Sequence, residues 1–368
     1  MKIKLHTLST GDSVYHNRSN RSIILLFEQP RKVLSTSLMN GGYCENLTAV
    51  FNHNSNYDGE AGTLQPPTYE EYMQLAAKEA GLDPDTVSGM GTAASMENVA
   101  IQSATYENLT VTAVVTGGVE INGGRVGDPA TYFQPIEKST LHKSGTINIM
   151  LVIDADMPPS SLARALVTCT EAKTAALQEL MAGSNYSNGL ATGSGTDQTI
   201  VIANPDSDLY LESAGKHSKL GELIGRVVKQ AVKEALLLQT GLSPKMQHSV
   251  LRRMKRFGVT EETVWQEYVS DNSGEVIKPQ FLEYLSKIDT DGQLVAYTSL
   301  YVHLLDQFLW ELLPGEEVMQ TGSELIALVA GNFGIPPMPI AGPELQDYVQ
   351  AWAKLVSDIV KFNMSAPY

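Results

Sequence analysis

Residues 214–224 read AGKHSKLGELI and place four candidate residues directly before a strongly patterned helix. Ser218 is a natural N-cap, and Gly215 allows a tight approach into the helix. Packing requires neither Lys216 nor His217. The free N–H groups of a first helical turn can hold an oxyanion, Lys216 would add a positive charge, and His217 can exchange a proton near neutral pH. This combination indicates acyl-transfer chemistry, with a capping or surface histidine as the alternative.

Two other site types do not fit this segment or the remaining histidines. A phosphate-binding loop needs Gly at position 210 and Ser or Thr at 217, where Tyr and His stand. The seven histidines show no HExxH or other ligand spacing. We therefore expect neither a phosphate loop nor a metal site.

A second candidate is Lys173, which falls on the apolar side of a predicted helix. At about 100° per residue, one face of the helix over residues 162–180 collects Leu162, Ala165, Leu166, Cys169, Ala176, Leu177 and Leu180. A buried ammonium is costly unless it is paired. Lys173 must reach solvent, pair with a carboxylate or face a pocket. Cys169 is expected in the core, and Glu171 on the opposite, solvated face.

The third candidate is the loop ATGSGTD at residues 191–197, which leads directly into a strand. It would present Ser194, Thr196 and Asp197 where that strand begins. Loops often do this without a function, and the GxG does not extend to GxGxxG because Gln198 stands at the required Gly. The loop alone is a weak signal.

These candidates lie on alternating strands and helices. Short apolar runs at 21–28 and 31–38, joined around Gln29 and Pro30, predict an antiparallel pair. Strands are also expected over 109–124, 145–154 and 198–203, and helices over 67–82, 158–180 and 218–238, where Thr68 and Gly81 would begin and end the first helix. This order predicts an α/β fold with a mixed sheet layered with helices.

The length and the change of character near residue 243 predict two domains. Residues 1–242 form the α/β domain, and residues 243–368 form an all-α module that holds Trp265, Trp310 and Trp352. Aromatic side chains at helical spacing usually lie in a core or a dimer interface. A homo-oligomer through this module is therefore a possible assembly.

Composition limits the partners and the compartment. A formal net charge of -15 argues against a nucleic-acid surface and favours a cationic or neutral small partner. The first residues carry two lysines without an apolar run behind them, so we expect no signal peptide. The most hydrophobic segment, residues 294–313, is interrupted by His303, Asp306 and Glu311, so we expect no membrane span. Two cysteines give no disulfide framework, and we expect a cytoplasmic protein.

Three blocks together resemble the adenosylcobinamide amidohydrolase family of corrinoid salvage: residues 145–180 with TEAKTAAL, 191–203 with ATGSGTD, and 214–228 with KHSKLGELIG. The resemblance covers residues 33–242. It implies hydrolysis of the amide that joins the aminopropanol arm to the corrin ring, giving adenosylcobyric acid for cobamide salvage. The cobalt would belong to the corrinoid substrate, so no cofactor is expected. The stretch NGGRVGD at 122–128 departs from the family's usual Arg-Ala-Gly-Asp, which puts substrate preference in doubt.

The residues themselves suggest a mechanism. His217 would act as general base and then as general acid, with Asp197 orienting it. Lys216 and the N–H groups near Ser218 would stabilise the oxyanion, and Lys173 would line the same cleft. Polar side chains of the matching blocks are expected to bind the substrate: Thr192, Ser194, Thr196, Ser218, Asn122, Arg125, Asn148 and Glu171.

Two alternatives stay open. Ser194 or Thr196 could be a covalent nucleophile in place of water. The chain could also be a corrinoid-binding or corrinoid-handling protein without hydrolytic activity, as the altered NGGRVGD stretch would allow. The tryptophans of the helical module could then line a corrinoid pocket, although a core or interface role is the expectation for them.

Overall fold

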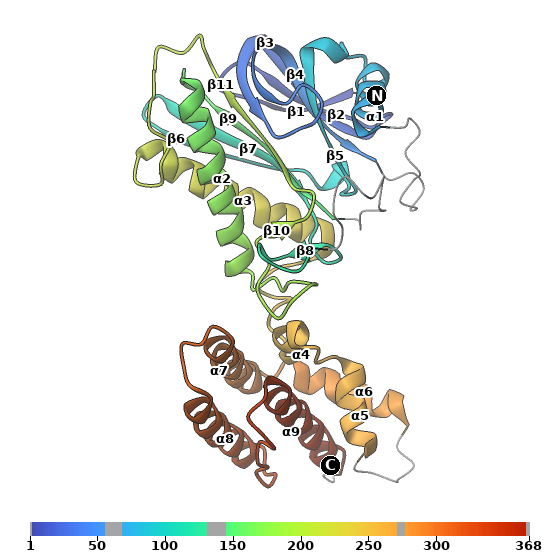
Figure 1. Cartoon of the computed structure of the whole chain (residues 1–368). Helices are drawn as coiled ribbons and strands as arrows, with labels where there is room; N and C mark the ends of the chain where they lie inside the picture. Colours follow the sequence, from blue (N-terminus) through green and yellow to red (C-terminus); the bar gives the residue numbers. More distant parts are fainter. Residues whose placement is uncertain (1, 56–67, 131–144, 271–276, 366–368) are drawn as a thin grey trace. The chain divides into compact units, whose positions relative to one another are not determined.

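The computed structural model describes residues 2–55, 68–130, 145–270 and 277–365. The chain divides into two compact units, Met1–Ser243 and Pro244–Tyr368, one residue past the boundary expected from the sequence. Each unit buries its own set of apolar side chains. The expected fold class, a mixed α/β sheet layered with helices and followed by an all-α module, is confirmed (Figure 1).

The N-terminal unit is built on one mixed sheet, which has nine strands within the described residues. Its order is β1-β2-β3-β11-β9-β7-β6, and β4 pairs with both β3 and β5. The bounds are β1 (Lys2–Thr7), β2 (Ser13–Asn17), β3 (Ser22–Ser35), β4 (Gly42–Asn54), β5 (Val87–Thr92), β6 (Ala100–Tyr106), β7 (Leu109–Gly117), β9 (Ile147–Ile153) and β11 (Gln198–Ala203). A separate small ladder joins β8 (Gly123–Gly124) to β10 (Gly193–Ser194).

The centre of the sheet is a parallel pair joined by a helix. Strands β9 and β11 run parallel, and α2 (Pro159–Glu179) connects them. The helix α3 (Lys219–Thr240) packs on α2 and on the sheet. Strand β9 is buried along its whole length, as its β-branched apolar sequence predicts. Because the two strands are parallel neighbours, the residues that precede them meet at one edge of the sheet.

The predicted hairpin around Gln29 and Pro30 is wrong. A single strand, β3, runs through both residues and pairs with β4, with register shifts between Leu26 and Val33. Proline cannot donate a ladder hydrogen bond, and such irregular positions are where a strand tolerates it. The interruption at Gln29 and Pro30, which predicted a turn, instead marks an irregularity within one strand.

The helix α1 (Tyr69–Glu79) begins and ends as predicted. The Thr68 hydroxyl accepts a hydrogen bond from the Glu71 N–H, and Gly81 takes the left-handed conformation with φ of 75°. A buried hydrogen-bond chain ties this helix to the sheet, because His53 contacts the Tyr72 hydroxyl and the Ser22 hydroxyl, each at 3.0 Å. Two short 3₁₀ helices, Pro84–Thr86 and Met96–Asn98, follow.

His53 makes the stability of this unit pH-dependent. Burial lowers the pKa of His53 from 6.5 to about 4, with a smaller contribution from the charge of Arg21. The unfolded chain therefore takes up the proton first, and stability present above pH 6.5 is lost as the pH falls towards 4. The difference corresponds to about 3 kcal/mol. We expect His53→Gln to flatten this pH dependence in denaturant titrations, and an unchanged slope between pH 7 and 4 would contradict the assignment.

The C-terminal unit is helical in its described residues. Its elements are α4 (Val250–Met254), a 3₁₀ turn (Lys255–Phe257), α5 (Glu261–Ser270), α6 (Lys278–Asp289), α7 (Gly292–Leu309), α8 (Gly315–Asn332) and α9 (Leu345–Ser365). Trp352 is buried and stacks on Tyr301 with ring centroids 4.3 Å apart, and Trp265 packs edge-on against Phe281. Trp310 is 41% exposed. Two of the three tryptophans thus serve the packing of this unit.

No helix in the described part of the chain combines the length and the apolar run that crossing a membrane requires. Most of the hydrophobic segment 294–313 forms α7. There Asp306 is buried, and its Oδ2 lies 2.6 Å from the Arg256 Nη2 in an ion pair. That pair stays inside the C-terminal unit.

Candidate active site

The polar residues of two loops meet at the edge of the sheet where β9 and β11 begin. Gln198 lies opposite Asn148 in the parallel ladder, and Ile147 lies opposite Gly117 at the end of β7. Just before β11, Gly193 pairs with Gly124 in the small β8–β10 ladder. The loop 191–197 is therefore fixed between the central strands and the glycine-rich stretch after β7.

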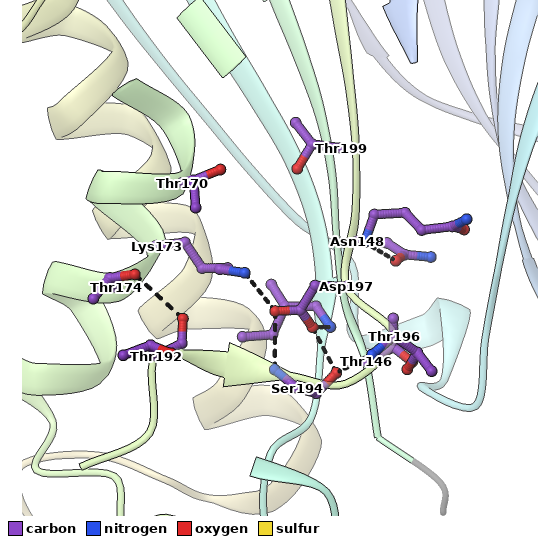
Figure 2. Close-up of polar contacts among 12 residues, drawn as sticks. Thr146, Asn148, Thr170, Lys173, Thr174, Thr192, Ser194, Thr196, Asp197 and Thr199 are labelled. Carbon is purple, nitrogen blue, oxygen red and sulfur yellow. Dashed lines mark hydrogen bonds and ion pairs between the residues drawn. The ribbon is translucent and has the colours of Figure 1, made fainter. Parts of the chain in front are cut away.

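Lys173 and Asp197 form an ion pair at the centre of this edge. The Lys173 Nζ lies 2.5 Å from the Asp197 Oδ2, and the side chains are only 12% and 9% exposed. Lys173 projects from α2 towards the loop, as Figure 2 shows. The lysine on the apolar face of its helix is thus explained by pairing with a carboxylate.

Asp197 is held by three further hydrogen bonds. Its Oδ1 accepts from the Ile147 N–H at 2.7 Å and from the Ser194 hydroxyl at 2.6 Å, and its Oδ2 accepts from the Ser194 N–H at 3.0 Å (Figure 2). Fixed donors of this kind hold a carboxylate in one orientation. A continuous chain therefore runs from the Lys173 ammonium through Asp197 to the Ser194 hydroxyl.

Gly193 lies directly against this pair. A Cβ at position 193 would lie within 3.0 Å of both the Asp197 Oδ2 and the Lys173 Nζ, a separation that real Cβ atoms essentially never show. At Gly195, two residues on, a Cβ would meet nothing within 4 Å. The first glycine of GSG makes room for the ion pair, and the second borders open space.

Thr196 braces the loop on the other side of Asp197. Its hydroxyl lies 2.7 Å from the Thr146 hydroxyl and donates to the Gly145 carbonyl at 3.2 Å. Asn122 donates to the same carbonyl at 3.1 Å. Gly145 has φ of 133°, which favours glycine. These bonds lock the two loops together.

The remaining predicted binding residues nearby are also engaged within the protein. The Thr192 hydroxyl accepts from the Val126 N–H at 2.9 Å, and the N–H of Arg125 donates to Asp128 at 2.7 Å. Asn148 is buried, donating to Asn52 at 2.8 Å and accepting from the Gln198 N–H at 3.2 Å. Asn148 is thus buried and bonded to the neighbouring strands.

The segment before α3 is placed differently from the expectation. Ser218 caps the helix, since its hydroxyl accepts from the Gly221 N–H at 3.1 Å. Lys216 pairs with Glu171 at 3.1 Å, with both side chains largely solvated. His217 is exposed and makes no hydrogen bond within the described residues. The contact in which Asp197 was to orient His217 is not formed, because Asp197 is used by Lys173, Ser194 and Ile147.

This correction has a physical cause. Capping requires only Ser218, and the charge of Lys216 is met by a carboxylate one helix away. No hydrogen bond or ion pair of the described residues connects this group to Lys173. The predicted cluster thus divides into a surface group before α3 and a half-buried group at the sheet edge.

The family model for adenosylcobinamide amidohydrolase matches residues 5–244, more than half of the chain. The chain belongs to this family. The half-buried group at the sheet edge lies within the matched residues, whereas the C-terminal helical unit lies almost entirely outside them. Membership in the adenosylcobinamide amidohydrolase family makes the chain a hydrolase by class.

Two curated proteins are similar in sequence to this chain. An uncharacterized protein of Methanocaldococcus jannaschii, MJ1613, is 32% identical over 251 residues, covering 64% of this chain and 91% of that protein. The adenosylcobinamide amidohydrolase of Methanosarcina mazei is 29% identical over 185 residues, covering 48% of this chain and 79% of the relative.

Two solved structures show a distant likeness to this family member. The PH0078 protein of Pyrococcus horikoshii OT3 has a TM-score of 0.30 at 13% identity, over 70% of this chain and 92% of that one. A beta-aminopeptidase of Burkholderia sp. has a TM-score of 0.30 at 14% identity, over 62% and 79%. Scores at this level carry no weight for fold or chemistry.

The exposed position of His217 gives a direct test of the two groups. We expect His217→Ala to leave kcat/KM for amide hydrolysis close to the wild-type value, because the imidazole touches neither Lys173 nor Asp197. Steady-state kinetics at several pH values checks this. If the variant is inactive while its thermal unfolding is unchanged, His217 is the general base and the sheet-edge group does not suffice.

Sequence reasoning missed Thr146 and Gly193 as site residues. A signal for Thr146 was present, because both central strands are preceded by a threonine, at positions 146 and 196. Parallel neighbours bring such residues together. Within the described residues no three His, Cys, Asp or Glu side chains form a cluster that could hold a metal ion.

Proposed function

We propose that this chain hydrolyses the amide that joins the aminopropanol arm to the corrin ring of adenosylcobinamide, giving adenosylcobyric acid for cobamide salvage. The observation that carries the proposal is the half-buried Lys173–Asp197 pair, bonded to the Ser194 hydroxyl inside the family-matched residues. A carboxylate that contacts both a hydroxyl group and an ammonium group is an arrangement that acyl-transfer chemistry can use.

The chemistry of a linear amide fits this group. Hydrolysis needs a nucleophile, stabilisation of the tetrahedral oxyanion and a proton for the departing amine. Asp197 can take a proton from the nucleophile, and Lys173 can supply positive charge and a proton. The 2.5 Å contact between them allows a proton to cross and restore both groups.

The surroundings suit a large, partly apolar, cationic corrinoid. The chain has a formal net charge of -15. Two exposed apolar residues lie on the loop beside the site, Val126 at 82% and Ile121 at 61% exposure, and the N–H of Val126 bonds to Thr192. Exposed apolar side chains beside a polar centre are typical of ligand-binding surfaces. We propose that they contact the corrin face.

Incubation of the full-length protein with adenosylcobinamide tests the proposal. Mass spectrometry should detect free aminopropanol and a corrinoid carboxylic acid in equal amounts. Binding seen as a change in the corrinoid absorbance, without aminopropanol release, would instead support a corrinoid-handling protein. If the protein neither binds adenosylcobinamide nor releases aminopropanol, the proposal is wrong.

Three further proposals accompany this function. The reaction needs no resident cofactor, because the cobalt is part of the substrate. The protein acts in the cytoplasm, a location supported by the free cysteines Cys44 and Cys169. The C-terminal helical unit joins copies of the chain, which light scattering on the full-length protein would test.

A further inference from the structure

The geometry points to a covalent route in which Ser194 is the nucleophile and forms an ester with the corrin acid. This inference rests on the proposed amide hydrolysis and decides between the hydroxyls of the loop. Ser194 donates its hydroxyl proton to the Asp197 Oδ1 at 2.6 Å and also accepts the Thr196 N–H at 3.3 Å. A nucleophile bonded to a base that a third group orients is the arrangement that acyl transfer uses.

The neighbouring hydroxyls are committed to structural bonds. The Thr196 hydroxyl is bonded to the Thr146 hydroxyl and to the Gly145 carbonyl, both just before β9, and neither of these groups is a base. The Thr192 hydroxyl accepts a backbone N–H from the β8 loop. Of these three hydroxyl groups, that of Ser194 is therefore the one that donates to Asp197 and can lose its proton to it.

Space and a donor are present beside Ser194. A Cβ at Gly195 would meet nothing within 4 Å, so a carbonyl group has room there. The backbone N–H of Gly195 makes no hydrogen bond with any residue that the structure describes. We assign it as a donor to the oxyanion, the role that a backbone N–H next to a nucleophile commonly has.

The first half-reaction balances with the groups present. The Ser194 oxygen bonds to the amide carbon, and its proton moves to Asp197. The C–N bond then breaks as the Lys173 ammonium protonates the departing amine, which leaves as aminopropanol. A proton crosses from Asp197 to Lys173 over their 2.5 Å contact and restores the charged pair.

The second half-reaction needs water as its only further reactant. A water molecule adds to the ester carbonyl and gives its proton to Asp197. The bond to Ser194 breaks, the serine oxygen takes the proton from Asp197, and the corrin acid leaves. Asp197 and Ser194 thus act in both halves, and Lys173 acts in the first.

Trapping the ester tests the inference. Wild-type protein mixed with adenosylcobinamide and quenched in acid should gain the mass of the corrin acyl group on the peptide that contains Ser194. Added hydroxylamine should divert part of the acyl group from the corrin acid to a corrin hydroxamate. Ser194→Ala should form neither product, whereas Ser194→Thr and Thr196→Val should still form the adduct.

The outcomes separate this inference from the proposed function. If the wild type releases aminopropanol but gives neither adduct nor hydroxamate, or if Ser194→Ala releases it at the wild-type rate, water is the nucleophile and the hydrolase assignment stands. If the wild type releases no aminopropanol, both fall. Because the hydroxylamine experiment uses wild-type protein, it decides the question even where a variant fails to fold.

Discussion

Asp197→Asn lowers kcat for adenosylcobinamide hydrolysis by about 10² to 10⁴-fold, the usual contribution of a positioned acid or base. The amide keeps the size of the carboxylate and can still accept the Ile147 N–H. It cannot take a proton from Ser194, and its NH₂ group cannot pair with the Lys173 ammonium. The variant therefore removes the charge at nearly the same size, and its NH₂ group also gives up the hydrogen bond from the Ser194 N–H. Aminopropanol release under saturating substrate measures the effect.

A matched control comes from the same helix as Lys173. Glu179 forms surface ion pairs with Lys229 and Lys233, and its side chain is 44% exposed. Glu179→Gln should change the free energy of unfolding by less than about 1 kcal/mol and leave hydrolysis unaffected. Equal activity of Asp197→Asn and Glu179→Gln would show that the buried pair has no part in the reaction.

Gly193→Ala is the second change with a large expected effect. The added methyl group would overlap both ends of the Lys173–Asp197 pair, so either the pair opens or β10 moves away from β8. A displacement of about 1 Å at a catalytic group can cost about 100-fold in rate. We expect a loss of that size in kcat.

Gly225→Ala provides the control for the glycine variant. Gly225 lies in α3, where a Cβ meets nothing within 4 Å, so an alanine there should preserve hydrolysis and favour the helix. Thermal unfolding of both variants shows whether Gly193→Ala is folded. Wild-type activity in a folded Gly193→Ala protein would mean that the pair tolerates the methyl group and that its close geometry is not needed.

Much of the fold could be predicted because it follows local rules. Strand β11 covers the six residues that were predicted for it, and Ser218 and Thr68 cap their helices as their side chains predict. The helical positions of α2 identified Lys173 as the charge that needed a partner. The hairpin at Pro30 could not be told from a bulge, because both begin with the same interruption of an apolar run.

The partner of Lys173 could not be read from the sequence. Asp197 is 24 residues away along the chain, and only the parallel pairing of β9 and β11 under α2 brings the two together. Conversely, His217 and Lys216 were predicted to be catalytic from their residue types and spacing. Both side chains are exposed to solvent just before α3. Spacing identifies the capping residue, but packing decides where its neighbours point.

A crystal structure of Asp197→Asn with adenosylcobinamide, cooled soon after soaking, tests the central claim most directly, because hydrolysis is slowed and Ser194 is retained. The account predicts that the carbonyl carbon of the aminopropanol amide lies about 3 to 3.5 Å from the Ser194 Oγ, with the amide nitrogen facing Lys173. An amide held instead beside His217 at the start of α3, or a corrinoid bound to the C-terminal helices, would contradict it.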